Sequence, residues 1–161
     1  MPITNPQLAK AEASIESKIQ PKDKASHQKI VIAGLKVLFS KELNGELFNN
    51  LRQSKNPAIS TAEGIIGLLG ILYKQSRNTM PVGPMVTAGM TLILNSLDFA
   101  EQAGIIKVDN EMIDLATEHY LESLLPKIGV TPEQLQQVLG KLGQMSQDPS
   151  IMEKLKQGNA A

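Results

Sequence analysis

Few side chains in this sequence could carry out acid–base or metal chemistry, and their spacing suits neither. There are two histidines, His27 and His119, and no cysteine, which excludes a disulfide, a thiolate metal site and a cysteine nucleophile. Glu118 directly precedes His119, and adjacent helical residues point to different sides, so this carboxylate cannot orient the imidazole. Di-iron bundles need a glutamate three residues before a histidine, but Ala116 holds that position. His27 lies in a polar stretch near the start of a predicted helix, where we expect it to be solvated.

One acidic cluster remains, at spacings of three and four along a predicted helix. Its members are Glu111, Asp114, Glu118 and Glu122. Stacked carboxylates can bind a hard cation, but such a run is more commonly a solvated helix face or a surface for a basic partner. No serine lies in a G-x-S-x-G elbow, and the glycines at 64, 67 and 70 lack the strand and the Lys-Ser/Thr ending of a phosphate loop. We therefore predict no catalytic residue, no metal, no cofactor and no small-molecule substrate, and we expect that the protein is not an enzyme.

Composition narrows the class of protein further. The 161 residues correspond to about one domain. Lys and Arg number 16 and Asp and Glu number 16, and aromatic residues are 3% of the chain. A dedicated nucleic-acid binder would show a basic excess or aromatic stacking platforms, so we expect no specific nucleic-acid partner. The hydrophobic share of 42% is too high for a disordered chain, and the first residues lack the apolar segment of a secretory signal.

The N-terminal residues 1–22 are predicted to form an amphipathic arm. Asn5 and Pro6 place a capping residue before a proline at the first helical position. Apolar residues then recur at helical spacing, in a stripe one residue wide: Leu8, Ala11, Ile15 and Ile19. Such a stripe is too thin to enter a core fully. Two hypotheses stay open: a partly frayed surface helix, or an arm that docks on a neighbouring subunit through Leu8, Ile15 and Ile19.

The middle of the chain predicts an apolar helical hairpin. Ser60 and Glu63 match a capping box for a helix over 61–77 that is apolar nearly all round, as buried helices are. Glycine costs about 1 kcal/mol relative to alanine in a helix interior, so the glycines at 64, 67 and 70 indicate that another backbone of the chain approaches closely there. A membrane contact surface is the alternative. A second helix is predicted over 82–103, with Gly104 as its stop. Residues 78–97 carry no charge, and this segment has about the length of a bilayer span. Its prolines, glycines and polar residues nevertheless favour a central helix of a soluble bundle.

Helical patterns also cover the rest of the chain. We predict a helix over 24–40, a break at Asn44-Gly45, a short helix over 46–53, and a helix that Asp109 caps and Pro126 ends. Further helices are expected to begin near Thr131-Pro132 and Asp148-Pro149. No segment shows the alternating pattern of a strand. The prediction is an all-α bundle of six to eight helices around a central apolar hairpin. Residues 1–22 form the arm, 23–146 the helical core domain, and 147–161 a short helix and loose tail.

The segment GLLGILYKQSRNTMPVGPMVTAGMTLILNSLDFAEQAG, residues 67–104, resembles small virion proteins of tailed bacteriophages. In those proteins an apolar helix ends in a Tyr/Phe-Lys-x-Ser-Arg turn, and a Thr-Met-Pro sequence starts a long apolar helix. The matching residues here are 73–77 and 79–81, and the Leu-Asp-Phe ending at 97–99 also fits. The resemblance implies a structural component of a phage particle, in the head, the neck or tail, or the set delivered during DNA ejection. It assigns no functional residues.

The resulting hypothesis is a non-enzymatic structural or assembly protein of a virion, present in host cytoplasm during assembly. Its expected partners are further copies of itself and other virion proteins. One alternative is a membrane-interacting protein of ejection or lysis that uses the 60–97 hairpin. The other is a soluble assembly chaperone or regulator that holds a partner helix in a methionine-lined groove. The methionines proposed for that groove are Met85, Met90, Met112, Met145 and Met152.

Overall fold

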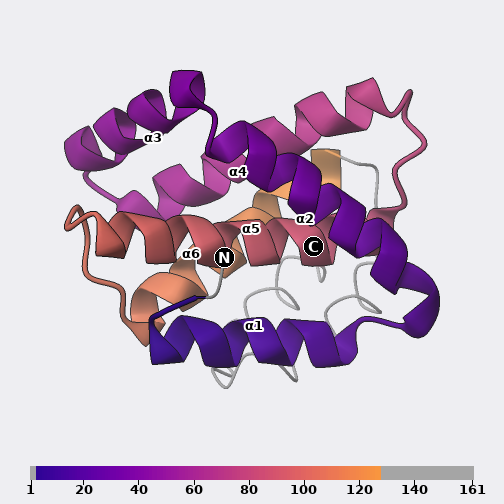
Figure 1. The fold of residues 1–161 in the computed structure, drawn as a ribbon, viewed down its shortest axis with the longest axis horizontal. Coiled ribbons are helices and arrows are strands. Elements are labelled where there is room, and N and C mark those ends of the chain that lie inside the picture. The colour runs from indigo at the N-terminus through magenta and orange to yellow at the C-terminus, as the bar shows by residue number, and fades with distance from the viewer. Residues whose placement is uncertain (1–2, 128–161) are drawn as a thin grey trace, which may run out of the picture.

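The computed structural model describes residues 3–127, and all regular structure in that range is helical (Figure 1). The helices are α1 (Pro6–Lys18), the 3-10 helix η1 (Pro21–Asp23), α2 (Lys24–Leu38), α3 (Lys41–Gln53), α4 (Pro57–Gln75), α5 (Val82–Gln102) and α6 (Asn110–Lys127). The prediction of an all-α bundle is therefore confirmed. The helices expected near 131 and 149, and the tail, lie outside the described residues.

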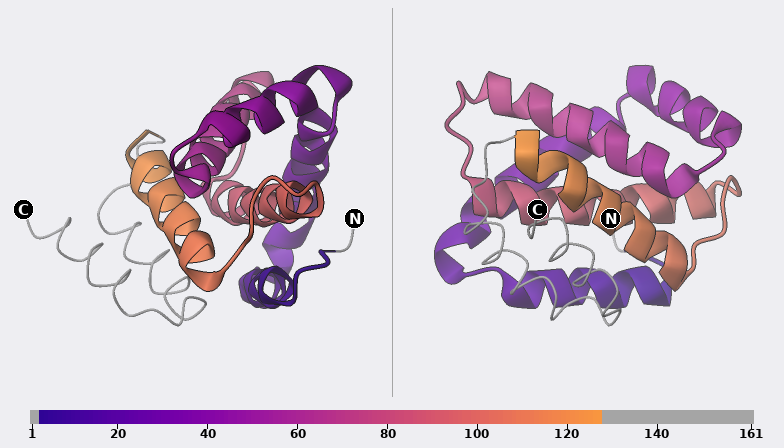
Figure 2. Two further views of the ribbon diagram at one scale, coloured as in Figure 1. Left: turned by 90° about the vertical axis from the view of Figure 1, so that its left-hand side faces the viewer. Right: turned by 180° about the vertical axis from the view of Figure 1, so that it is seen from behind.

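The long helix α5 is the centre of the bundle. Helices α1, α2, α4 and α6 all contact it, and the end-on view in Figure 2 shows them arranged around it. Nearly every residue from Pro84 to Ala100 is buried. The charge-free stretch at 78–97 therefore supplies the helix that the others cover, since a buried charge would need a partner. Among the described helices, none has the length and apolarity required to cross a membrane.

Two glycines let helices approach closely in the core, and neither belongs to the predicted ladder at 64, 67 and 70. A Cβ added to Gly34 of α2 would lie 2.5 Å from Leu92 Cδ1 of α5. A Cβ added to Gly89 of α5 would overlap the hydroxyl of Tyr120 from α6. That tyrosine is fully buried, and its hydroxyl donates a hydrogen bond to the carbonyl of Met85 at 3.1 Å, with the Val86 carbonyl 3.2 Å away.

Two predicted helix starts are wrong, and both errors concern capping. Helix α3 begins at Lys41 and runs through Gly45, because Ser40 caps it by accepting from the Leu43 N–H at 3.4 Å. Helix α4 begins at Pro57, one turn before the predicted start. Asn56 accepts from the Ile59 N–H at 3.4 Å, so an Asn-Pro pair starts α4 as another starts α1.

The end expected at Pro126 is also wrong, since α6 continues through Pro126 to Lys127. Two other predicted boundaries are confirmed. Gly104 has a φ of 74°, the left-handed conformation in which a helix commonly ends. Asp109 accepts from the Met112 N–H at 2.8 Å at the start of α6. Both signals are local: a glycine can adopt a positive φ, and a side-chain oxygen can accept from an N–H in the first turn of a helix. The sequence was therefore sufficient to locate them.

Candidate interaction surface

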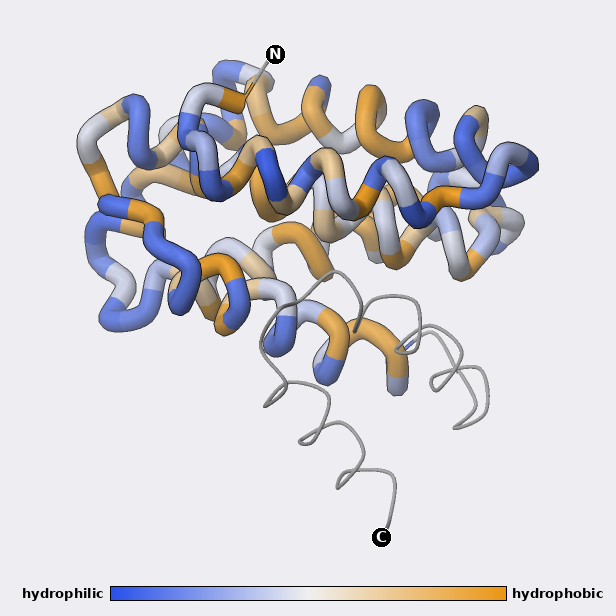
Figure 3. The backbone as a smooth tube through the Cα atoms, turned by 90° about the horizontal axis from the view of Figure 1, so that it is seen from below, coloured by the Kyte–Doolittle hydropathy of each residue, from blue (hydrophilic) through white to orange (hydrophobic). Residues whose placement is uncertain are grey.

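The N-terminal stripe is buried within its own chain, which corrects the expectation that it was too thin to enter the core. Leu8 is 0% exposed and Ile15 is 2% exposed, and both belong to the cluster that packs around α5. Ile19 is half-buried. In Figure 3, where α1 lies nearest the viewer, its hydrophobic positions are interleaved with hydrophilic ones. A narrow apolar stripe can be buried here because it packs against the apolar surface of α5. Leu8 and Ile15 are thus not free to dock on a second subunit in this fold.

A buried carboxylate secures the start of α1 to the end of α5. Oδ1 of Asp98 accepts hydrogen bonds from the backbone N–H groups of Thr4 (3.1 Å) and Asn5 (3.0 Å), and from the Thr4 hydroxyl. Its Oδ2 accepts from Gln102 at 2.6 Å. Burial raises the pKa of Asp98, but these hydrogen bonds outweigh it and the pKa is lowered overall. Asp98 therefore acts as a structural anchor that stays ionised.

The two histidines lie apart, and the structure corrects the expectation for His27. His27 is 5% exposed and its Nδ1 hydrogen-bonds with the Thr87 hydroxyl at 2.9 Å. The prediction of a solvated side chain is therefore wrong, because α2 turns this face toward α5. Burial lowers the pKa of His27, an effect that the Glu16 charge partly opposes. Nε2 of His119 on α6 lies 3.3 Å from the Glu63 carboxylate on α4.

The acidic stripe does not assemble into a metal site. Glu111 and Glu122 are exposed, and Asp114 and Glu118 are half-buried, along α6. Within residues 3–127, no group of three or more acidic residues or histidines is placed so that it could hold a metal ion. The methionines differ from the expected groove as well: Met85 and Met90 are buried in the core, and Met112 is half-buried. Met145 and Met152 lie outside the described residues.

The glycine ladder faces outward, which overturns the expectation that another backbone of the chain packs against it. Gly64, Gly67 and Gly70 are all exposed. Among residues 3–127, a Cβ built on any of them meets no heavy atom within 4 Å, neighbouring residues and the helix's own backbone aside. Helix α4 uses the opposite side for packing, with Ala62, Ile65 and Leu69 buried there. The helix is therefore buried on one side only, although its composition is apolar nearly all round.

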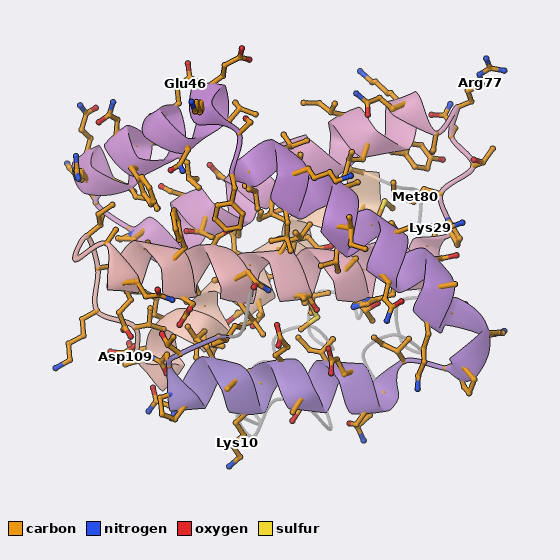
Figure 4. All side chains as sticks on the ribbon, in the orientation of Figure 1. Lys10, Lys29, Glu46, Arg77, Met80 and Asp109 are labelled. Atoms are coloured by element: carbon orange, nitrogen blue, oxygen red, sulfur yellow. The ribbon has the colours of Figure 1, made fainter. Side chains whose placement is uncertain are left out.

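We call this exposed side the outer face of α4. It consists of Glu63, Gly64, Gly67, Gly70, Ile71 and Lys74, all exposed. Ile71 is 53% exposed, and the Glu63 side chain is 64% exposed. The second half of α4 runs along the upper edge of the molecule in Figure 1, and the view from behind in Figure 2 shows the same. Arg77, labelled in Figure 4 just beyond the end of α4, points away from the bundle.

The sequence did contain a signal for the orientation of this face. Residues four, seven and eleven positions apart share one side of a helix, so Glu63, Gly67, Gly70 and Lys74 lie together. Charged residues at both ends of a stripe mark a side that faces water. The exposed Ile71 had no such marker, because apolar residues surround it in the chain.

Comparison with protein-family models, with curated protein sequences and with solved structures finds no match to this chain. The outer face of α4 is therefore interpreted from its own geometry. It combines nearly bare backbone with one exposed isoleucine and a charge at each end. Such a surface suits contact with another helix, since a helix can approach closely where no side chain intervenes.

Proposed function

We propose that this protein is a non-enzymatic structural or assembly component of a tailed-phage virion, acting through helix-mediated protein–protein contacts. The observation that supports the proposal is the outer face of α4, where three glycines are exposed within one helix. Virion proteins act in many copies, so a surface of this kind would be used repeatedly.

The energetic argument starts from the cost of glycine. Each glycine in an exposed helix interior costs about 1 kcal/mol relative to alanine, so Gly64, Gly67 and Gly70 together cost about 3 kcal/mol. The described part of the chain offers no steric reason for them, since an alanine Cβ would fit at all three positions. Close approach by a helix from outside is a use that would offset this cost. The cost is large, because a domain is stable by only about 5–15 kcal/mol.

The phage context is supported by the resemblance at residues 67–104. This segment covers the second half of α4, the turn, and α5. In the turn, Arg77 and Asn78 have φ angles of 57° and 60°, an uncommon conformation for residues with side chains. The resembling segment thus contains part of the outer face of α4 and the central helix of the bundle.

Mass spectrometry of density-gradient-purified particles, prepared from the strain that encodes the chain, tests the proposal. We expect the chain to sediment with the particles at a constant ratio to the major particle proteins after a high-salt wash. A chain that is abundant in the lysate but missing from washed particles would contradict the proposal. A host ribosomal protein measured in the same fractions controls for carry-over.

A further inference from the structure

We propose that the outer face of α4 binds the same face of a second copy of this chain, with the two α4 helices antiparallel about a two-fold axis. The inference rests on the proposed function, because it names the partner of the surface described there. A two-fold interface is self-complementary: when one residue contacts another, the reverse contact is made as well. The outer face of α4 meets that condition in its charges and in its shape.

The charges are placed symmetrically about the glycines. Glu63 lies four residues before Gly67, and Lys74 lies four residues after Gly70. When Gly67 of one copy lies opposite Gly70 of the other in an antiparallel pair, each Glu63 lies opposite a Lys74. Two identical ion pairs then form at the ends of the contact. A parallel pair in register would instead place like charges opposite each other, which is unfavourable.

The shape of the surface supports the same arrangement. At 3.6 residues per turn, Glu63, Gly70 and Lys74 lie along one side of the outer face, and Gly64 and Ile71 along the other. A two-fold axis that reverses the helix direction places each side of the outer face of α4 against the same side in the other copy. Ile71 of one copy therefore lies over Gly64 and Gly67 of the other, where no Cβ occupies the space. This contact would cover the exposed isoleucine and bring the two backbones together.

The pair that Glu63 makes with His119 is compatible with this contact. Their atoms are 3.3 Å apart, yet the Glu63 side chain remains 64% exposed, so its carboxylate can accept from a second cation. The other large exposed hydrophobic residues in the described chain are Ile32, Leu43 and Val82. They lie on three other helices, and single exposed apolar residues of this kind are normal.

The expected association is weak in free solution. Stable protein–protein interfaces bury at least about 1,200 Å² in total, and one pair of helices of this length buries less. We therefore expect reversible dimers that are populated at high protein concentration. The high local concentration of subunits in a particle would favour the same contact.

Cysteine cross-linking tests the register directly, because the chain contains no cysteine of its own. A mixture of Glu63→Cys and Lys74→Cys proteins should form the mixed disulfide dimer at least about tenfold faster than either variant forms a dimer with itself. A mixture of Lys10→Cys and Glu46→Cys, both exposed on other helices, measures random collision. Mixed cross-linking at that control rate, or faster pairing of position 63 with position 63, would overturn the proposal.

Sedimentation equilibrium with glycine variants tests the close approach. Gly67→Leu should weaken dimerisation by about tenfold or more, because its side chain would hold the two backbones apart. Gly45→Leu is the matched control, since Gly45 is also an exposed helical glycine with open space around a Cβ. Equal dimerisation of the two variants and the parent would refute the contact, as would a parent that stays monomeric at its highest soluble concentration.

A charge swap tests the ion pairs and separates this inference from the proposed function. Glu63→Lys and Lys74→Glu should each weaken the dimer, whereas the double variant should recover it, since it restores opposite charges across the axis. No recovery would count against the antiparallel pairing. A chain present in particles but without 63–74 cross-links would refute this inference alone. A chain that forms the cross-links but is missing from particles would refute the proposed function alone.

Discussion

Replacing glycines by alanine, one position at a time, should divide them into two classes that differ in the sign of their effect on stability. The structure places Gly89 in a tight contact between α5 and α6, and Gly67 on the open outer face of α4. Alanine at Gly67 adds a methyl group where there is room and removes the helix penalty of glycine. We therefore expect Gly67→Ala to increase the free energy of unfolding by about 1 kcal/mol.

Alanine at Gly89 adds its methyl group where Tyr120 already is. The new Cβ would overlap the tyrosine hydroxyl and lie 2.8 Å from Leu69 Cδ1. Tyr120 is fully buried and hydrogen-bonded to the α5 backbone, so it cannot move aside freely. Overpacking costs about 1–3 kcal/mol, and the loss of a buried hydrogen bond costs about 1–3 kcal/mol more. After the gain of about 1 kcal/mol in helix propensity, the net loss should be about 1–5 kcal/mol.

Urea unfolding followed by far-ultraviolet circular dichroism measures these differences, since the helical signal is strong and the chain has no tryptophan. The protein should be dilute, so that self-association does not contribute to its stability. Gly34→Ala should fall between the two cases, because the atoms it meets are the flexible methyl end of Leu92. Gly45→Ala is the exposed control and should behave like Gly67→Ala. Equal stability of Gly89→Ala and the parent would refute the packing described at α5 and α6.

Three further predictions follow from the buried polar groups and from α1. Leu8→Ala should lower the free energy of unfolding by about 2–5 kcal/mol without changing self-association; unchanged stability in urea would show that α1 does not pack as described. Asp98→Asn should cost about 2 kcal/mol at neutral pH. Because the folded pKa of Asp98 is lowered, this carboxylate stabilises the fold fully above pH 3.8, and the stabilisation is lost as the pH falls through the folded pKa. The acid unfolding of Asp98→Asn should therefore lack the loss of stability that Asp98 contributes. The folded pKa of His27 is also lowered, so the parent should lose stability as the pH falls from 6.5 through the folded pKa. His27→Gln should reduce this dependence of the free energy of unfolding on pH. An equal dependence in both proteins would argue against the burial of His27.

Local rules located several elements correctly because they act over a few residues. A glycine with positive φ ends α5, and an aspartate caps α6. The charge-free stretch correctly indicated the central helix, because a helix covered on all sides cannot carry unpaired charges. The starts of α3 and α4 depend on rules of the same local kind, because Ser40 and Asn56 cap these helices. The prediction is wrong there because Asn44-Gly45 also has the composition of a break, and Ser60 with Glu63 also matches a capping box.

Helical periodicity shows which residues share a side of a helix, but it does not show what that side meets. Gly67 and Gly89 both lie within apolar segments, yet one faces open space and the other faces Tyr120. The burial of Leu8 depends on α5, more than seventy residues away in the chain. The burial of His27 likewise depends on α5, because its imidazole hydrogen-bonds with Thr87 of that helix. Short-range preferences of the chain were thus enough to establish helices and their ends. The packing of distant segments decided which faces are covered, because that depends on the shapes of all the helices at once.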